Sequence, residues 1–261
     1  MTINWVPFFT LLSKEVKRFL KVSGQTVLTP LVSASLYLLI FGVSIGRQID
    51  LQNNVSYLAF LIPGLVMMSC LNNAFQNSSS SIVSSKFSGD LEDLKVAPLS
   101  IEEIIWAIAL GGLFRGFLVG MVTFLVGQFF YFHHHGAWMS IEHPLHLISF
   151  ICLGGVAFAL LGLSVAFWAK TFDQLAVVGS FILLPLIYLG GVFFSIQNLP
   201  PVWQSISQFN PLLYFINGVR YGVLGISDVS MASAYFISGI SLAILYAMAK
   251  ICLTRASFQR W

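Results

Sequence analysis

The sequence has very few charged residues. Asp, Glu, Lys and Arg together make up 9% of its 261 residues, whereas 57% are hydrophobic. A soluble domain carries about a quarter charged residues, and a soluble fold this apolar would have too little polar surface to face water. The shortage of charge therefore excludes an ordinary soluble domain and indicates a protein that lies within a lipid bilayer.

Cysteines and motifs for energy use or catalysis are also scarce. The three cysteines lie in apolar runs, where a thiol usually packs as a small hydrophobe, so no disulfide framework is expected. The chain has no GxxxxGK[ST] phosphate-binding loop and no HExxH zinc motif. Its acidic residues fall in loops or at the boundaries of the hydrophobic segments, so a proton relay across the membrane is not expected. We expect no cofactor and no metal to be bound by this chain.

What the chain does have is six hydrophobic segments of the length that crosses a bilayer, about 20 residues each. They are expected at residues 26–46, 57–75, 104–132, 144–169, 175–194 and 232–253. Ser100 and Glu103 have the spacing of a capping box at the start of the third. The polar run from Asn72 to Ser81 is expected to leave the membrane. The predicted fold class is an all-α integral membrane protein with six transmembrane helices.

Residues 1–25 precede the first span and are predicted to form an amphipathic helix. Trp5, Phe8, Leu12, Val16 and Phe19 recur every three or four residues, and the other side is basic, with Lys14, Lys17, Arg18 and Lys21. Such a helix lies at the lipid headgroups. It is too long and too charged for the start of a secretory leader, so no cleavable signal is expected. Residues 26–255 are predicted to form the transmembrane domain and residues 256–261 a short tail.

The distribution of basic residues predicts the orientation. Six spans place both termini on one side, and of the 13 lysines and arginines only Arg47, Arg115 and Arg220 fall elsewhere. Since Lys and Arg accumulate in cytoplasmic loops, both termini are expected in the cytoplasm.

Two interruptions of the hydrophobic pattern are informative. The charged segment 86–97 follows the second span and is predicted to contain a short cytoplasmic helix that docks on a partner; a solvated loop is the alternative. Residues 195–231 are apolar but broken by Pro200, Pro201, Asn210 and Pro211. Because these pieces are too short to span, they are predicted to be re-entrant, where freed backbone faces protein or water.

Arg115 is the one clear charge within a span. Burying a guanidinium costs several kcal/mol unless it meets a partner or water, and Asn72, Asn73 and Gln76 are its candidate partners. A transport pathway and a structural pairing of helices remain equally open. Beside it, glycines 112, 116 and 120 form a flat helix face, which favours close helix packing.

Five histidines cluster around the loop between the third and fourth spans: His133, His134, His135, His143 and His146. Together with Glu142 they leave a membrane enzyme open as a third hypothesis. No further carboxylates converge on them, so a physiological metal site is not expected.

Two passages resemble the membrane subunit of type-2 ATP-binding-cassette exporters. One is FLIPGLVMMSCLNNAF leading into KFSGDLEDLKVAPLS, and the other is YLGGVFFSIQNLP leading into FNPLLYFINGVRYGVLG. The similarity extends over nearly the whole chain in order, from the basic N-terminal helix to the broken hairpin before the sixth span. The resemblance implies a homodimeric permease powered by two copies of a separate ATPase subunit, which uses ATP and Mg. Its expected partners are therefore that ATPase, a second copy of itself and membrane lipid, and no nucleic acid.

The resemblance also implies roles for particular residues. The coupling helix that seats in the ATPase would comprise Asp90, Leu91, Glu92, Asp93 and Leu94, ended by Pro98. Lys14, Lys17 and Arg18 would belong to the membrane-surface helix, and the stretch from Pro200 to Arg220 would form external re-entrant hairpins. Spans one, two and five would line a substrate path between protomers, with Asn72, Asn73, Gln76 and Arg115 along it. A self-sufficient secondary transporter or channel, motivated by Arg115 and the polar stripe, is the alternative.

Overall fold

The computed structural model describes residues 5–46, 55–91 and 96–255, and within these ranges the regular structure is entirely helical. The helices in chain order are α1 (Trp5–Leu20), α2 (Ser23–Tyr37), the π-helix η1 (Leu38–Ile45), α3 (Tyr57–Ser88), α5 (Ile101–His135), α6 (Pro144–Trp168), α7 (Phe172–Val178), the π-helix η3 (Gly179–Leu183), α8 (Leu184–Leu189), the 3-10 helix η4 (Ile196–Asn198), α9 (Pro201–Gln208), α10 (Pro211–Leu224) and α11 (Met231–Arg255).

Six helical segments of the described chain are long and apolar enough to cross a bilayer: Gly24–Ile45, Tyr57–Ser88, Ile101–His135, Pro144–Trp168, Phe172–Leu189 and Met231–Arg255. The prediction of an all-α membrane protein with six spans is therefore confirmed. The third begins at a complete capping box, in which Ser100 Oγ accepts from Glu103 N and the Glu103 carboxylate accepts from Ser100 N. This cap, too, was predicted.

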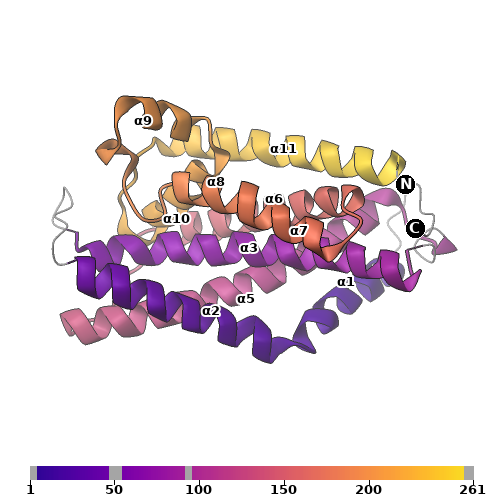
Figure 1. Ribbon diagram of the computed structural model, residues 1–261, viewed down its shortest axis with the longest axis horizontal. Helices are drawn as coiled ribbons and strands as arrows, with labels where there is room; N and C mark the ends of the chain where they lie inside the picture. Colours follow the sequence, from indigo (N-terminus) through magenta and orange to yellow (C-terminus); the bar gives the residue numbers. More distant parts are fainter. Residues whose placement is uncertain (1–4, 47–54, 92–95, 256–261) are drawn as a thin grey trace.

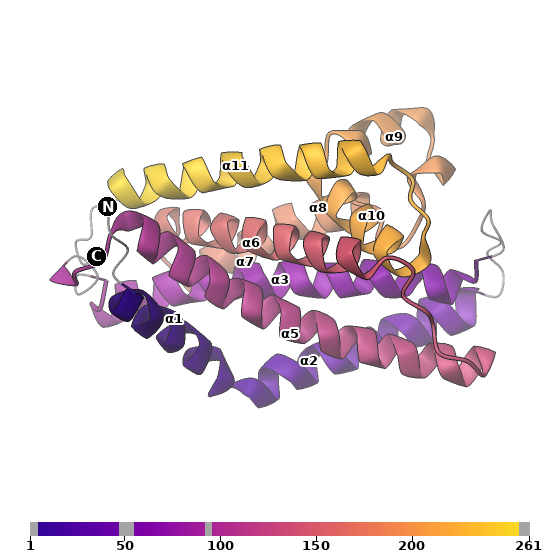
Figure 2. The ribbon, with the colours of Figure 1, turned by 180° about the vertical axis from the view of Figure 1, so that it is seen from behind.

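α3 is the central helix. It packs against α5, α6 and α10, while α11 lies along one edge of the molecule and α2 along the opposite edge (Figures 1 and 2). α5 approaches α3 closely at two glycines. A Cβ added at Gly116 would lie 2.6 Å from the Cys70 carbonyl oxygen, and a Cβ added at Gly112 would lie 2.7 Å from Ser78 Oγ. The interpretation of these glycines as a packing face is confirmed.

The polar run after the second hydrophobic segment belongs to the same helix. Residues 72–81 continue α3, with Asn77, Ser78 and Ser79 buried, and their expected exit from the membrane stays a prediction. The hydroxyls are satisfied nearby, as Ser78 Oγ donates to Ile108 O of α5 and Ser79 Oγ to Gln76 O. Small side chains that bond to backbone carbonyls can therefore remain helical inside a packed bundle.

The two ends of the molecule have different character. One end, here called the α1 end, holds α1, the end of α3, the turn between α6 and α7, and the end of α11 (Figure 1). The opposite end, here called the α9 end, holds the start of α3, the end of α5, and α9 and α10. Because α9 and α10 have 8 and 14 residues, neither reaches the length of a span.

Prolines begin the helices of the α9 end. Pro201 and Pro211 occupy the first positions of α9 and α10, where a missing N–H costs nothing. Pro200 precedes α9, and Asn210 caps α10 by accepting from Leu212 N at 3.1 Å. Asn210 Nδ2 also donates to Leu186 O at 2.6 Å, which fixes the hairpin to α8.

Candidate functional site: a polar groove beside the first, second and fifth spans

A groove of about 760 Å³ runs between α2, α3 and the α7–η3–α8 span, and Arg115 of α5 also lines it. Its lining includes all four residues predicted to lie on a substrate path. The polar lining residues are Gln25, Thr26, Thr29, Ser33, Ser69, Asn72, Asn73, Gln76, Ser79, Ser80, Arg115 and Ser180. The structure thus brings Asn72, Asn73, Gln76 and Arg115 to one surface, and their role in transport stays a prediction.

The lining changes character along the groove. Toward the α9 end its walls are largely apolar, with Ala34, Tyr37, Leu65, Met68 and Leu184. Toward the α1 end, amides and hydroxyls of α2 and α3 face the apolar residues at the start of α7. A groove with one polar half and one apolar half suits an amphiphilic ligand.

Arg115 has no hydrogen bond or ion pair with any residue of the described ranges, and its Nε is buried without a partner. The pairing expected with the neighbouring amides is not formed, since Asn73 Nδ2 donates to Ser69 O of its own helix at 3.1 Å. Arg115 is also the one Lys, Arg, Asp, Glu or His among the described residues that line the groove. The groove therefore carries an unneutralised positive charge.

The two spans that flank the groove are loosely packed, as is Met231–Arg255 at the edge of the bundle. Gly24–Ile45 and Phe172–Leu189 are largely exposed, whereas Tyr57–Ser88 between them is largely buried. Each flanking span contains a π-helical turn, η1 and η3, a distortion that is frequent at functional sites. Exposed apolar side chains such as Leu28, Val32 and Val177 cover their outer faces.

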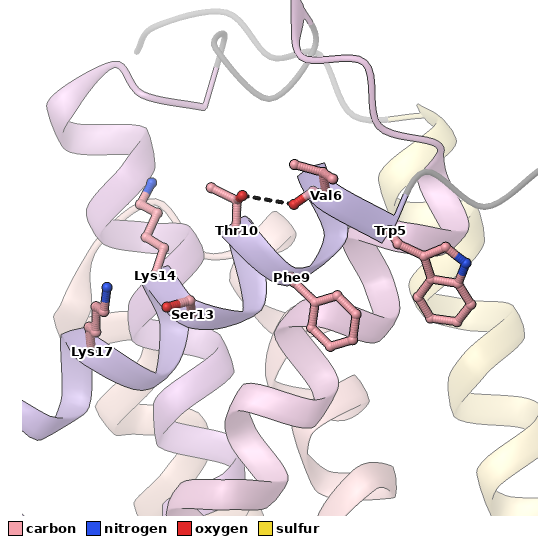
Figure 3. Close-up of a pocket in the computed structure, with 7 residues that line it drawn as sticks. All are labelled: Trp5, Val6, Phe9, Thr10, Ser13, Lys14 and Lys17. Atoms are coloured by element: carbon pink, nitrogen blue, oxygen red, sulfur yellow. Dashed lines mark hydrogen bonds between the residues drawn. The ribbon is translucent and has the colours of Figure 1, made fainter.

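α1 has the predicted amphipathic character with one difference. The rings of Trp5 and Phe9 project to one side and the amino groups of Lys14 and Lys17 to another, all of them exposed (Figure 3). Arg18 instead turns inward to α3, where it donates to Asn77 O at 2.6 Å and to Ser80 Oγ at 3.1 Å.

Arg18 meets a carboxylate that the sequence reasoning missed. Glu15 is 2% exposed; it accepts from Ser81 Oγ at 2.6 Å and pairs with Arg18 Nη2 at 3.2 Å. Glu15 can pack against α5 because residue 111 is a glycine. A Cβ at Gly111 would lie 2.7 Å from Glu15 Cβ. A signal existed, since Glu15 lies four residues from both Leu11 and Phe19, the other buried residues of α1.

The segment that leads out of α3 is tied to the turn between α6 and α7. Lys86 Nζ donates to the carbonyl oxygens of Ala166 at 2.7 Å, Phe167 at 2.9 Å and Ala169 at 3.0 Å. Next to it, Phe87 stacks on Phe172, the first residue of α7, with ring centroids 5.7 Å apart. A lysine in this place satisfies carbonyls that the end of α6 would otherwise leave open.

Only some of the predicted coupling residues lie within the described ranges. Asp90 and Pro98 are exposed, whereas Leu91 is 4% exposed and packs within the chain's own core. Glu92, Asp93 and Leu94 lie outside the described residues. Asp90 and Pro98 are therefore the predicted coupling residues whose side chains a partner can reach among those described, and Val96 between them is exposed as well.

Arg220, by contrast with Arg115, is held through both of its Nη atoms, although its Nε, like that of Arg115, is buried without a partner among the described residues. It is 1% exposed; its Nη2 donates to Gly191 O at 2.6 Å, its Nη1 lies 4.0 Å from Asp228 Oδ2, and its guanidinium sits 3.8 Å from the Phe60 ring centroid. Burial lowers the pKa of Arg220 to about 10 and Asp228 opposes the shift, so the guanidinium stays charged at neutral pH. The cluster fixes the turn at Gly191, whose φ of +83° favours glycine.

The histidines do not form a metal centre in the part of the chain that the structure describes, where no three His, Cys, Asp or Glu side chains lie close enough to hold an ion. His133, His134 and His135 are exposed at the end of α5, while His143 and His146 pack on the Tyr221 ring at centroid distances of 4.6 and 5.1 Å.

A GxSxG pentapeptide, residues 42–46, does not mark a hydrolase. Its Ser44 lies in η1 and donates to Leu39 O at 3.1 Å. The nucleophilic serine of that motif sits instead on a sharp turn between a strand and a helix.

Comparison with known proteins gives consistent results. The family model described as ABC-2 type transporter matches residues 7–224. The chain is 38% identical over 252 residues to the inner membrane transport permease YadH of Escherichia coli (strain K12), covering 97% of this chain and 95% of that protein. It is 26% identical over 230 residues to nodulation protein J of Rhizobium leguminosarum bv. trifolii, covering 86% of this chain and 82% of the relative. The chain belongs to the ABC-2 type transporter family of membrane permeases.

Proposed function

We propose that this chain is the permease subunit of an ATP-driven exporter of the bacterial inner membrane, that it acts as a homodimer, and that two copies of a separate ATPase subunit drive it with ATP and Mg. The single observation that carries the proposal is the groove lined by Asn72, Asn73, Gln76 and Arg115 between spans one, two and five. Membership of a transport permease family supports the same reading.

The dimer proposal rests on the outer faces of the flanking spans. The groove is lined by α2 and the α7–α8 span, both of which leave most of their surface exposed. A second copy applied to these exposed faces would close the groove and give a path between protomers. An isologous contact of this kind is the commonest form of homodimer.

The orientation proposal rests on charge. The α1 end carries Lys14, Lys17, Arg18, Lys86, Lys170, Lys250 and Arg255, and basic residues favour the cytoplasmic side. Both termini and Asp90 would then face the cytoplasm, where an ATPase is available, and the hairpin of α9 and α10 would lie on the external side.

Reconstitution with a co-expressed phosphate-loop ATPase from the same organism tests the energy source. We expect Asp90→Lys to reduce co-purification of the ATPase, and Glu142→Lys, an equally exposed charge reversal at the α9 end, to leave it unchanged. Leu91→Asp is a poor probe because this side chain is buried in the chain itself. Flux driven by an ion gradient through the isolated chain would instead establish a secondary transporter or channel.

Cysteine cross-linking tests the dimer. In a variant whose three native cysteines are replaced, Val32→Cys on α2 and Val177→Cys on α7 are expected to form disulfide-linked dimers in membranes. Ile244→Cys on α11 is the matched control, since it is equally apolar and 61% exposed. Cross-linking through α11 alone would contradict the proposed interface.

A further inference from the structure

Resting on the proposed export function, we propose that the groove selects amphiphiles with an anionic head group, which Arg115 binds while an alkyl chain lies along the apolar half toward the α9 end. Neither the family nor its named members fix the charge of the ligand. The inference comes from the charge balance and the polar atoms of the groove itself.

The first step is that the charge of Arg115 has no counter-ion. No described lining residue is acidic, and no described residue bonds to its guanidinium. Arg18 offers the contrast, because its Nη2 pairs with Glu15 and donates to Asn77, although its Nε too is buried without a partner. A partly buried and unpaired guanidinium is costly in an apolar medium, and an anion in the groove would remove that cost.

The second step is that other polar groups lining the groove have no partner among the described residues. Thr26 Oγ1 lines the groove, is buried and has no hydrogen-bond partner. The amides of Asn72 and Gln76, one helical turn apart on α3, also line it and donate to no described residue. Guanidinium and amide N–H groups around one oxyanion form charge-assisted hydrogen bonds, roughly twice as strong as neutral ones.

The third step concerns the rest of the ligand. An inorganic anion would occupy only the polar half, leaving the walls around Tyr37, Leu65 and Met68 unfilled. Apolar surface buried there by an alkyl chain contributes favourably in proportion to its area. A cationic amphiphile would place its head beside Arg115 and be repelled, so the site discriminates by charge as well as by shape.

Binding to the purified full-length chain in phosphatidylcholine nanodiscs tests the proposal, with radiolabelled dodecyl phosphate as the probe and empty nanodiscs subtracted. We expect saturable binding that weakens roughly tenfold or more in Arg115→Gln, the size expected for losing a hydrogen bond to a charged group, and is largely retained in Arg115→Lys. Lys14→Gln removes the same charge from the exposed face of α1 and should leave the affinity unchanged. Dodecyltrimethylammonium should not compete, and inorganic phosphate should compete far more weakly than unlabelled dodecyl phosphate.

Three outcomes would overturn the inference: unchanged affinity in Arg115→Gln, equal competition by the cationic amphiphile, or equal competition by inorganic phosphate, which would assign the site to a free anion. No ATPase takes part in this measurement. A failure here therefore leaves ATP-driven export to be judged by Asp90→Lys, and a failure of that experiment leaves the binding result standing.

Discussion

Arg115 and Arg220 lie in regions of opposite construction. Arg220 is enclosed where α10 packs against α3 and the turn after α8, and it meets a carbonyl, a carboxylate and an aromatic face. Arg115 lines a groove between loosely packed spans and bonds to no described residue. The same residue type is thus part of the scaffold in one place and left available in the other.

This contrast extends to the helices around each arginine. α3, α6 and α10 are largely buried and joined by close approaches at glycine, whereas α2 and α7 expose most of their surface. Substitutions in the packed region should therefore act mainly on the free energy of unfolding, and those in the groove mainly on ligand binding. Four substitutions test that division, from the largest expected loss of stability to the smallest.

Arg220→Met should cost the most. It removes the bond to Gly191 O and leaves the Asp228 carboxylate without its cation, a loss of about 3–5 kcal/mol for a buried pair. Thermal unfolding of the purified protein, followed by size-exclusion chromatography after heating, measures the effect. In this variant Asp228 keeps its bonds from Ser195 Oγ and Ile196 N. An unchanged melting temperature would mean that the Arg220 cluster does not support the hairpin.

Gly116→Ala should cost about 1–3 kcal/mol, the range for overpacking a well-filled interior. The new Cβ would lie 2.6 Å from the Cys70 carbonyl oxygen, so α3 and α5 must move apart. Gly239→Ala in α11 is the matched control, because nothing lies within 4 Å of its added Cβ. The control should gain a little stability from helix propensity, and a loss equal to that of Gly116→Ala would remove packing as the cause.

Local signals predicted the fold well. Hydrophobic length marks each of the six spans, and the spacing of Ser100 and Glu103 marks a cap, because both depend on residues near one another in the chain. The burial of the α3 serines was missed because it depends on contact with another helix, as where Ser78 Oγ donates to Ile108 O of α5. That contact joins residues 30 apart in the sequence, and no local pattern contains it.

The candidate site was predictable in part. The sequence singles out Arg115 as an isolated charge, and the family resemblance implies that spans one, two and five meet. That Arg115 stays unpaired, while Arg18 on the supposed surface face is bonded to Glu15, depends on which side chains reach each other across helices. Such distances follow from the packing of the whole bundle.

Lys86→Met tests the boundary between the packed helices and the groove. Lys86 ties the end of α3 to the end of α6, just before α7 of the groove wall begins. Losing three carbonyl contacts should cost about 1–2 kcal/mol. We expect faster amide hydrogen exchange in residues 169–174 than in the α3 core around Leu71. Exchange that rises equally everywhere would show that Lys86 stabilises the bundle as a whole and is not a local tie.

Arg115→Met should have the smallest effect on unfolding and gives the sharpest comparison with Arg220→Met. The substitution removes a charge that no described residue compensates and replaces it with an apolar side chain of similar length. The free energy of unfolding should therefore stay within about 1 kcal/mol of the parent or rise, as when an apolar residue replaces an unsatisfied polar group. The same heating assay measures both variants, so detergent and lipid effects cancel. A loss as large as that of Arg220→Met would mean that Arg115 holds the helices together, and the unpaired guanidinium would then be a structural feature that the groove merely exposes.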